Sequence, residues 1–467
     1  MIENWASALT EGRRADLARI FGAALERADP LRLMSRCLSL KGEELVIDSG
    51  ATQWRRDLRE FRRIVLLGFG KASARMALAL ERLLGDRIEG GVVITKRGHG
   101  ERLSRVELLE AAHPIPDASS EGAARRLLAV ARDTNESDLV INCISGGGSS
   151  LLCAPAPGLS LEDKRELYTA LLASGLPIEA VNCVRKHISA VKGGRLAEAL
   201  YPATSVNLIL SDVIGDDLSS IASGPTVPDP STWQDAAAIL ADSGMMAGLT
   251  PALRRVFDEG TAGLRPETSK PGDAIFEPCT NLLVGTNRLS LAAASDAAER
   301  LGYATLVLTS RLQGEARELS RLFVALALDI ETEGIPLSAP ACILAGGEST
   351  VTLRGKGTGG RNQEMALAFL DAANDAGLDL SRVAFLSGAT DGNDGPTDAA
   401  GGIVDAATRR GAAEARLRTK TALAANDSYA FLKAAGGLLV TGPTNTNVCD
   451  IQVLVVGADS ARAGPET

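Results

Sequence analysis

A dense group of glycines beside two basic residues is the first feature of this sequence that could do chemistry. The run from Ala345 to Met365 reads AGGESTVTLRGKGTGGRNQEM, with apolar residues before it that predict a strand and apolar residues after it that predict a helix. Its glycines let backbone N–H groups approach a ligand, and the helix N-terminus adds further unpaired N–H groups. Arg361 opens that helix, where a cation opposes the helix dipole, so a bound anion would explain its position. The pattern favours an anion site over an exposed hairpin with a solvated arginine.

A second candidate phosphate site follows an apolar strand in the first part of the chain. The strand Ile64 to Leu67 leads into the turn Gly68-Phe69-Gly70 and a helix that begins near Lys71. A strand, a glycine turn and a helix start are typical of dinucleotide or phosphate binding. However, Ser73 replaces the third glycine of the dinucleotide motif, and Lys96 follows the next strand, where a ribose-binding acid would be expected. The residues therefore favour a phosphate held by Lys71, with a surface lysine beside a packing turn as the alternative.

A third glycine segment follows the predicted strand Asp138 to Ile144. It places glycines and hydroxyls at the carboxyl end of the strand, in the order Ser145, Gly146, Gly147, Gly148, Ser149, Ser150. Such a segment suits an oxyanion cradle, and a tight structural crossover is the alternative. Further on, Arg185, Ser189 and Lys192 share one face of a predicted helix from Ile178 to Leu200, which glycines interrupt at 193 and 194. That basic face would meet either an anion or solvent.

Carboxylates follow two other predicted strands. Asp212 comes after Val206 to Leu210, where open α/β sheets place their chemistry. Asp391 begins a polar loop after Val383 to Leu386, but position twelve of this loop is Gly402, so the EF-hand pattern fails. The loop could hold Mg²⁺ or a ribose, or be a plain acidic turn. His113, between a third strand and a proline-rich loop, has either a catalytic or a structural role.

Strands and helices alternate over most of the 467 residues, which predicts an α/β fold with more than one domain. We expect a first domain over residues 1–235 and a second over 275–467, with the polar stretch 265–273 as the preferred boundary. The N-terminal segment, residues 1–30, is predicted to be an amphipathic helix of the mature fold, with a targeting peptide as the alternative. At the other end, the strands 438–441 and 451–456 are expected to pair across a polar loop.

Composition excludes several classes of protein. The net charge of −9 argues against nucleic acid as the main partner. Seven scattered cysteines without a C-x-x-C pair indicate buried, reduced thiols in a cytoplasmic protein rather than disulfides or a zinc site. No apolar run of about eighteen residues is present, so no membrane span is expected.

Motifs spread over nearly the whole chain resemble those of the bacterial glycerate 2-kinases. The matching segments are GFGKAS at 68–73, HPIPD at 113–117, SGGGSSLL at 145–152, VRKHISAVKGGRLA at 184–197, LSDVIGDDLSSIASGPTVPDPST at 210–232, GGE at 346–348, GTGGRNQEMALA at 357–368, TDGNDGPTDAAG at 390–401 and GPTNTNVCD at 442–450. The resemblance implies an N-terminal Rossmann-like α/β/α domain and a smaller, leucine-rich C-terminal α/β domain with a mixed sheet, whose core lies at about 341–457. It places the active site in the cleft between them.

The same resemblance implies a reaction and a set of residues. The γ-phosphoryl group of ATP would pass to the 2-hydroxyl of D-glycerate with Mg²⁺, and the family's catalytic residues fall on Lys71, Asp212 and Arg361. Asp212 would be either the base or a metal ligand, and Asp391 is a second candidate metal ligand. The expected substrate and nucleotide contacts are Gly68, Gly70, Ser145, Gly146, Gly147, Gly148, Ser149, Ser150, Arg185, Lys192, Gly347, Glu348, Gly357, Gly359, Gly360 and Asn362.

Two other functions stay open at this point. A nicotinamide-dependent hydroxypyruvate reductase, a label that some members of the family have carried, would need the ribose-binding acid that Lys96 replaces. A non-catalytic binder of sugar acids would use the same glycine segments without consuming ATP. We expect small molecules as the partners, and a monomer or a homodimer as the assembly.

Overall fold

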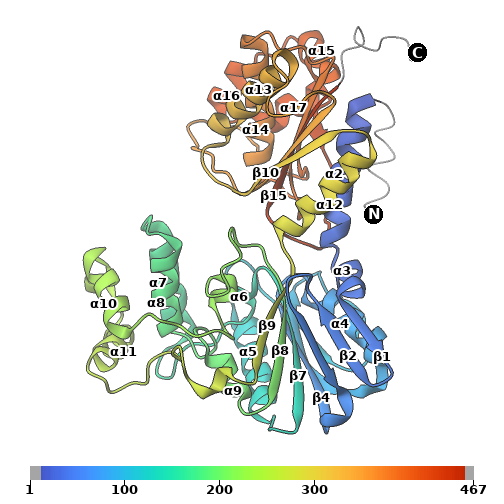
Figure 1. Ribbon diagram of the computed structural model, residues 1–467. Coiled ribbons are helices and arrows are strands. Elements are labelled where there is room, and N and C mark those ends of the chain that lie inside the picture. Colours follow the sequence, from blue (N-terminus) through green and yellow to red (C-terminus); the bar gives the residue numbers. More distant parts are fainter. Residues whose placement is uncertain (1–11, 458–467) are drawn as a thin grey trace. The chain divides into compact units, whose positions relative to one another are not determined.

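The computed structural model describes residues 12–457 (Figure 1). The chain forms two compact units. One unit is continuous and runs from Pro30 to Val284. The other, which we call the discontinuous unit, joins residues 12–29 with residues 285–457. Each unit is described by itself below.

A six-stranded sheet forms the centre of the Pro30–Val284 unit, and its spatial order is β6-β5-β4-β7-β8-β9. The strands are β4 (Arg63–Phe69), β5 (Ile88–Lys96), β6 (Glu107–Ala111), β7 (Asp138–Ile144), β8 (Thr204–Leu210) and β9 (Cys279–Gly285). The pairs from β6 to β8 are all parallel. This is the Rossmann strand order, in which the direction of winding reverses between the first and fourth strands, here β4 and β7. The expected Rossmann-like fold is confirmed.

Helices and a small second sheet complete this unit. Its helices are α3 (Pro30–Cys37), α4 (Ser73–Leu84), α5 (Ala118–Arg132), α6 (Gly148–Leu151), α7 (Leu161–Ala173), α8 (Ile178–His187), α9 (Arg195–Leu200), α10 (Trp233–Asp242) and α11 (Pro251–Thr261). The antiparallel sheet consists of β1 (Leu38–Lys41), β2 (Glu44–Asp48) and β3 (Gln53–Asp57). Apolar residues of α5 and α9 pack on the large sheet, whereas α7, α8, α10 and α11 share a separate core around Trp233 and Phe257. All seven residues of β7 are buried, as expected of a strand covered on both faces.

The discontinuous unit contains a mixed sheet of order β10-β11-β15-β12-β13-β14. Its strands are β10 (Ala304–Leu312), β11 (Ala341–Gly347), β12 (Val383–Ala389), β13 (Gly401–Val404), β14 (Leu438–Leu439) and β15 (Asp450–Val456). Only β10 and β11 pair in parallel among these strands, and β15 lies antiparallel between β11 and β12. The expected mixed sheet is therefore confirmed.

Helices cover both faces of the mixed sheet. They are α2 (Gly12–Ala28), α12 (Asn287–Arg300), α13 (Ala316–Thr332), α14 (Arg361–Asp375), α15 (Ala406–Glu414), α16 (Thr419–Ala425) and α17 (Ser428–Ala435). Apolar residues of α2 and α12 share one core with the sheet, and those of α13 and α14 share the core on the other face. The helices α2 and α12, more than 250 residues apart in the sequence, lie side by side (Figure 1).

The structure differs from the sequence-based expectations in three places. The first helix packs with the C-terminal half of the chain, and residues 236–284 belong to the continuous unit, so the division differs from the expected 1–235 and 275–467. The strand β14 pairs with β13, not with β15 as expected, because β15 is paired on both edges by β11 and β12. The long helix expected from 178 to 200 ends at His187. Ser189 and Lys192 therefore lie outside the helix that carries Arg185, and the argument that placed all three on one helical face was wrong.

Candidate active site

Three loops meet at the carboxyl ends of β4, β7 and β8. Lys71 follows β4, the segment Ser145–Ser150 follows β7, and Asp212 follows β8. Two hydrogen bonds join the first two loops: the Lys71 amide donates to the Gly146 carbonyl at 2.9 Å, and the Ala72 amide donates to Ser145 Oγ at 3.0 Å. These loops flank the point where the winding of the sheet reverses, which is where open α/β sheets bind their ligands.

The glycines of these loops are required by close approach. A Cβ atom on Gly146 would lie 2.1 Å from Asp212 Oδ2, and one on Gly70 would lie 2.2 Å from Ser145 Oγ. Gly147 has a φ of +80°, and its Cβ would lie 3.0 Å from His113 Nε2 and 3.3 Å from Lys71 Cγ. The side chains of Lys71, His113 and Asp212 therefore surround the backbone of residues 146 and 147. Only glycine fits there, because any larger residue would displace them.

Two backbone amides in this segment are available to a ligand. The amides of Gly148 and Ser150 donate to carbonyls of the same loop. Those of Gly146 and Gly147 donate to no acceptor among residues 12–457, although Gly146 is buried. Buried amides are almost always hydrogen-bonded, so an acceptor from a bound molecule would complete this site. Lys71, half-buried beside them, makes no ion pair within the described part of the chain and supplies a positive charge for that acceptor.

Buried cations lie behind the same segment. The side chain of Lys192, only 1% exposed, donates from Nζ to the carbonyls of Ser149 at 2.9 Å and Ala222 at 3.3 Å. Arg185, 8% exposed, stacks over the Tyr168 ring at 4.4 Å. Neither forms an ion pair with any carboxylate in residues 12–457, and burial lowers the pKa of both side chains. Because an uncompensated buried charge costs several kcal/mol, these two cations favour an anionic ligand nearby.

A chain of hydrogen bonds connects the Ser149 hydroxyl with Arg185. Ser149 Oγ lies 2.9 Å from Ser223 Oγ, and Ser223 donates to Asn182 Oδ1 at 3.2 Å. Arg185 Nη1 donates to the same Asn182 oxygen at 3.4 Å. Ser223 adopts a φ of +62°, which costs energy for a residue other than glycine and is common at functional sites. This network positions the hydroxyl of Ser149. The sequence showed Ser223 within a rigid loop but not its positive φ or its partners.

Arg361 is the first residue of α14, as the sequence predicted, and it is held by carboxylates of the discontinuous unit. Its Nη2 donates to Asp450 Oδ1 at 2.9 Å, its Nε donates to Asp450 Oδ2 at 2.5 Å, and its Nη1 lies 2.8 Å from Glu348 Oε1. Burial opposes the charge of Arg361, but its hydrogen bond and ion pair with buried Asp450 outweigh that effect and raise its pKa. The anion that explains the arginine at this helix start is therefore Asp450, which the sequence analysis did not single out. A carboxylate at the start of an apolar strand was the only available signal.

The helix N-terminus beside Arg361 is occupied by another carboxylate. Asp394 accepts from the amides of Asn362 at 3.1 Å and Gln363 at 2.8 Å. Burial raises the pKa of Asp394 to about 6, even though these amide hydrogen bonds favour the ionised form. A Cβ on Gly360 would lie 2.3 Å from Asp394 Cγ. The glycine at 360 is thus explained by the approach of Asp394.

The glycine loop before α14 packs against residues 425–428 of the same unit. The amides of Arg354 and Gly355 donate to Asn426 Oδ1, at 2.7 and 2.9 Å, and the Gly357 amide donates to the Ala425 carbonyl at 2.8 Å. A Cβ on Gly357 would lie 2.5 Å from Asp427 Cβ, and one on Gly359 would lie 2.0 Å from Ser428 Oγ. The amides of Gly355 and Gly357, in the loop expected to cradle an anion, are hydrogen-bonded within the protein. Close packing of two chain segments accounts for these glycines.

Other expected site residues have partners within their own units. Gly68 is the sixth residue of β4, and Gly148 is the first residue of α6. Gly347 ends β11, where its Cβ would lie 2.2 Å from the Leu312 carbonyl oxygen, and Glu348 is paired with Arg361. Ser387 Oγ donates to Asn362 Oδ1 at 2.6 Å. Asp391 accepts from the Asn393 amide at 3.0 Å, which makes a local turn.

No group of three or more His, Cys, Asp or Glu side chains suited to a metal occurs among residues 12–457. Magnesium is commonly held by only one or two carboxylates together with substrate phosphates, so such a cluster is not required. Asp212, at the edge of the sheet beside Gly146, has the oxygen donors that Mg²⁺ prefers. Asp391 lies in the other unit.

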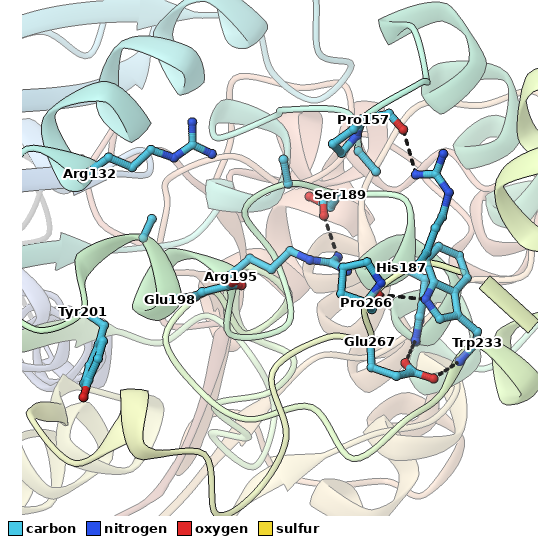
Figure 2. Close-up of a pocket in the computed structure, with 14 residues that line it drawn as sticks. Arg132, Pro157, His187, Ser189, Arg195, Glu198, Tyr201, Trp233, Pro266 and Glu267 are labelled. Atoms are coloured by element: carbon cyan, nitrogen blue, oxygen red, sulfur yellow. Dashed lines mark hydrogen bonds and ion pairs between the residues drawn. The ribbon is translucent and has the colours of Figure 1, made fainter. Parts of the chain in front are cut away.

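A separate pocket of about 560 Å³ lies in the Pro30–Val284 unit (Figure 2). Its walls include Arg132 and Tyr201, which precede β7 and β8, so this side of the pocket is near the amino ends of the strands. Several of its polar groups are paired with each other: Glu267 accepts from the Trp233 amide at 3.0 Å and contacts His187 Nε2 at 3.2 Å. The sequence analysis did not identify this pocket, because its walls come from segments as far apart as Arg132 and Glu267.

Comparisons with known proteins identify relatives over nearly the full chain. Residues 16–258 match a family model described as a domain of unknown function, DUF4147, and residues 341–450 match the MOFRL family. A protein named glycerate 2-kinase from Pyrococcus horikoshii is 39% identical over 448 residues, covering 95% of this chain and 97% of that protein. This chain belongs to the glycerate kinase family. The resemblance seen in the sequence motifs is thereby confirmed.

Two further comparisons extend this result. A crystal structure of glycerate kinase from Thermotoga maritima matches with a TM-score of 0.82 at 38% identity, covering 94% of this chain and 97% of that one. An Agrobacterium vitis relative, whose name assigns it provisionally as a hydroxypyruvate reductase, is 43% identical over 446 residues, or 95% of this chain and 94% of that protein. Both names thus occur among relatives of similar identity in the glycerate kinase family. No helix within residues 12–457 is long and apolar enough to cross a membrane.

Proposed function

We propose that this chain is a glycerate 2-kinase, which transfers the γ-phosphoryl group of ATP to the 2-hydroxyl of D-glycerate and forms 2-phosphoglycerate. The observation that carries the proposal is the meeting of Lys71, the two unpartnered amides of Gly146 and Gly147, and Asp212 at the reversal point of a Rossmann sheet. The glycerate kinase names of several relatives support the same reaction.

The arrangement suits phosphoryl transfer, in which the enzyme mainly positions the reactants and neutralises charge on the phosphoryl oxygens. Lys71 provides a positive charge for those oxygens, and the amides of Gly146 and Gly147 donate hydrogen bonds to them. Gly68, Gly70, Gly148 and Ser150 keep the two loops close enough for this. Asp212 accepts the proton of the substrate hydroxyl or holds a metal.

Magnesium, when bound, would neutralise phosphate charge and orient the phosphates. We propose Asp212 as its protein ligand, and Asp391 as a weaker candidate.

The carboxylate of glycerate would be bound through the buried cations behind the glycine segment. Arg185 and Lys192 supply positive charge, and the hydroxyls of Ser145 and Ser149 supply hydrogen bonds. In such an arrangement the enzyme would select a hydroxy acid over a neutral polyol, because a neutral ligand would leave the buried cations uncompensated.

For the discontinuous unit we propose that Arg361 stabilises the transferring phosphoryl group. Arg361 uses three of its donors on Asp450 and Glu348. These ion pairs hold the Arg361 guanidinium in one orientation. Its remaining N–H groups can therefore donate to a phosphoryl oxygen without a large loss of side-chain entropy. Gly347, Glu348, Gly357, Gly359, Gly360 and Asn362 would act by holding Arg361 and the start of its helix in place.

A coupled assay tests the proposal. The purified chain should consume ATP only when D-glycerate and Mg²⁺ are both present, and the product should be identified as 2-phosphoglycerate rather than 3-phosphoglycerate by NMR. Oxidation of NADH or NADPH by hydroxypyruvate, followed by absorbance, tests the reductase. Lys96 at the end of β5 argues against that activity, since this is the position of the ribose-binding acid in nicotinamide enzymes. Binding of glycerate without ATP turnover would indicate a sugar-acid binder.

We also propose that the protein binds only small molecules, that it is located in the cytoplasm, and that it is a monomer or a homodimer. Light scattering coupled to size-exclusion chromatography measures the assembly directly.

A further inference from the structure

Basic side chains gather at the carboxyl ends of three neighbouring strands. Lys71 follows β4, Lys96 is the last residue of β5 and His99 follows it, and His113 follows β6. These strands are adjacent and parallel, and their ends are in register: Phe69 pairs with Ile94, and Lys96 pairs with Ala111. Four groups that can carry positive charge therefore share one edge of the sheet.

Contact with one glycine brings two of these groups together, and the pKa shifts of the histidines agree with the shared edge of the sheet. The Cβ of a residue at 147 would lie 3.0 Å from His113 Nε2 and 3.3 Å from Lys71 Cγ, so both side chains contact the same glycine. Burial, followed by the charges of Lys71, Lys96 and His99, lowers the pKa of His113 to about 4. The pKa of His99 is lowered by burial and then by Lys96 and Lys71.

The charge in this cluster is not compensated by the protein. Within the described residues, neither Lys71 nor Lys96 forms an ion pair, and His99 Nδ1 is buried without a hydrogen-bond partner. Glu110, whose charge acts to raise the pKa of His99, accepts from the Gly98 amide at 3.1 Å. By contrast, Arg97 in the same loop is paired with Asp117 at 2.7 Å. Lys71 and His113 therefore contact the glycine segment, while Lys96 and His99 lie at the end of the neighbouring strand β5.

We propose that Lys96, His99 and His113, together with Lys71, form the subsite for the polyphosphate tail of the nucleotide. This inference rests on the proposed kinase function and specifies where the nucleotide phosphates bind. Lysine binds phosphate as a point charge, and a neutral imidazole can donate one N–H to a phosphate oxygen. A bound polyphosphate would raise the pKa of both histidines, so they would take up protons when it binds.

Calorimetric binding of ADP and of inorganic tripolyphosphate to the full chain tests the subsite. The variants are Lys96→Gln, His99→Asn and His113→Asn, and the matched control is Arg97→Gln, which removes a charge from the same loop that is already paired. A hydrogen bond to a charged group contributes enough that each test variant should bind ADP about tenfold to a hundredfold more weakly. The Arg97→Gln variant should bind as the parent does. In the parent, tripolyphosphate should compete with ATP and not with D-glycerate.

Proton uptake provides a second readout that a structural role would not change. The measurement is made at about pH 6, which is above the lowered pKa of His113 and near the ordinary pKa of histidine. At this pH the parent should take up protons when it binds ADP. Proton uptake is measured as a dependence of the binding enthalpy on the ionisation enthalpy of the buffer. His113→Asn should reduce that uptake.

Unchanged ADP affinity in Lys96→Gln and both histidine variants, each folded by circular dichroism, would overturn the subsite while leaving the kinase function intact. Absence of glycerate-dependent ATP consumption in the parent would instead refute the proposed function, and the ADP titrations would still report on the phosphate site.

Discussion

Replacing Gly146 by alanine tests the central geometry of the proposed site. The new methyl group would start 2.1 Å from Asp212 Oδ2 and 2.6 Å from Asp212 Cγ. The carboxylate oxygen would have to move by about 1.3 Å to reach an ordinary separation of about 3.4 Å. Gly146 has no positive φ, so alanine fits the backbone and the disturbance is confined to the side chain of Asp212.

The expected effect is a large loss of turnover in a folded protein. A displacement of about 1 Å in a reacting group can cost on the order of a hundredfold in rate, so we expect kcat to fall by about that factor. Overpacking of this kind costs about 1–3 kcal/mol of stability, which a two-unit protein of this size should tolerate. The assay is glycerate-dependent ATP consumption at saturating substrates, with thermal unfolding measured on the same sample.

Gly122→Ala is the matched control, because Gly122 lies in α5 and a Cβ there would meet nothing within 4 Å. It should leave kcat unchanged and stabilise the protein by about 1 kcal/mol, since alanine is the better helix former. If Gly146→Ala kept kcat within about threefold of the parent, the contact with Asp212 would have no bearing on the reaction and the site would be misassigned.

Four further outcomes follow from the structure. Lys71→Ala should abolish ATP consumption while circular dichroism stays that of the parent, and an unfolded variant would show that Lys71 is only structural. Arg361→Lys, which keeps a charge beside Asp450, should lower kcat at saturating glycerate by roughly a thousandfold if the arginine stabilises the transition state, and a loss of less than about tenfold would refute that role. Lys192→Met should raise the KM for glycerate, because an apolar side chain of similar length removes the buried positive charge. The melting temperature of this variant should fall only modestly, since the carbonyls of Ser149 and Ala222 lose a donor while a buried charge is removed. Burial raises the pKa of Asp394 to about 6 in the folded protein, so protonated Asp394 favours folding most below its unfolded pKa near 4. This contribution to the free energy of unfolding is lost as the pH rises to about 6. Asp394→Asn should therefore reduce the change in the free energy of unfolding between about pH 4 and about pH 6, measured by urea unfolding at a series of pH values.

Local sequence patterns were sufficient for several elements of both units. The strand 138–144 was predicted at its observed bounds, because every residue in it is buried and the run is apolar or uncharged apart from Asp138. The start of α14 at Arg361 was also predicted, since a glycine run gives way to helix-forming residues there. The loops after β4, β7 and β8 were identified by their glycines and charged residues.

Contacts between distant segments could not be predicted in the same way. The anion expected at Arg361 proved to be Asp450, 89 residues away, and the glycines from 355 to 360 face residues 425–428 and Asp394. A glycine that accommodates a neighbouring segment and one that admits a phosphate look the same in the sequence. Similarly, the end of α8 at His187 depends on the turn that buries Ser189 and Lys192, not on helix propensity.

The discontinuous unit has a consequence for biosynthesis. Helix α2 packs with α12, whose first residue is Asn287, so its apolar face has no partner until the ribosome has made the entire Pro30–Val284 unit. At translation rates of about 5–20 residues per second, that wait lasts roughly 10–50 s. The nascent helix would expose Leu17, Ile20 and Phe21 throughout this time, which makes it a natural binding site for chaperones.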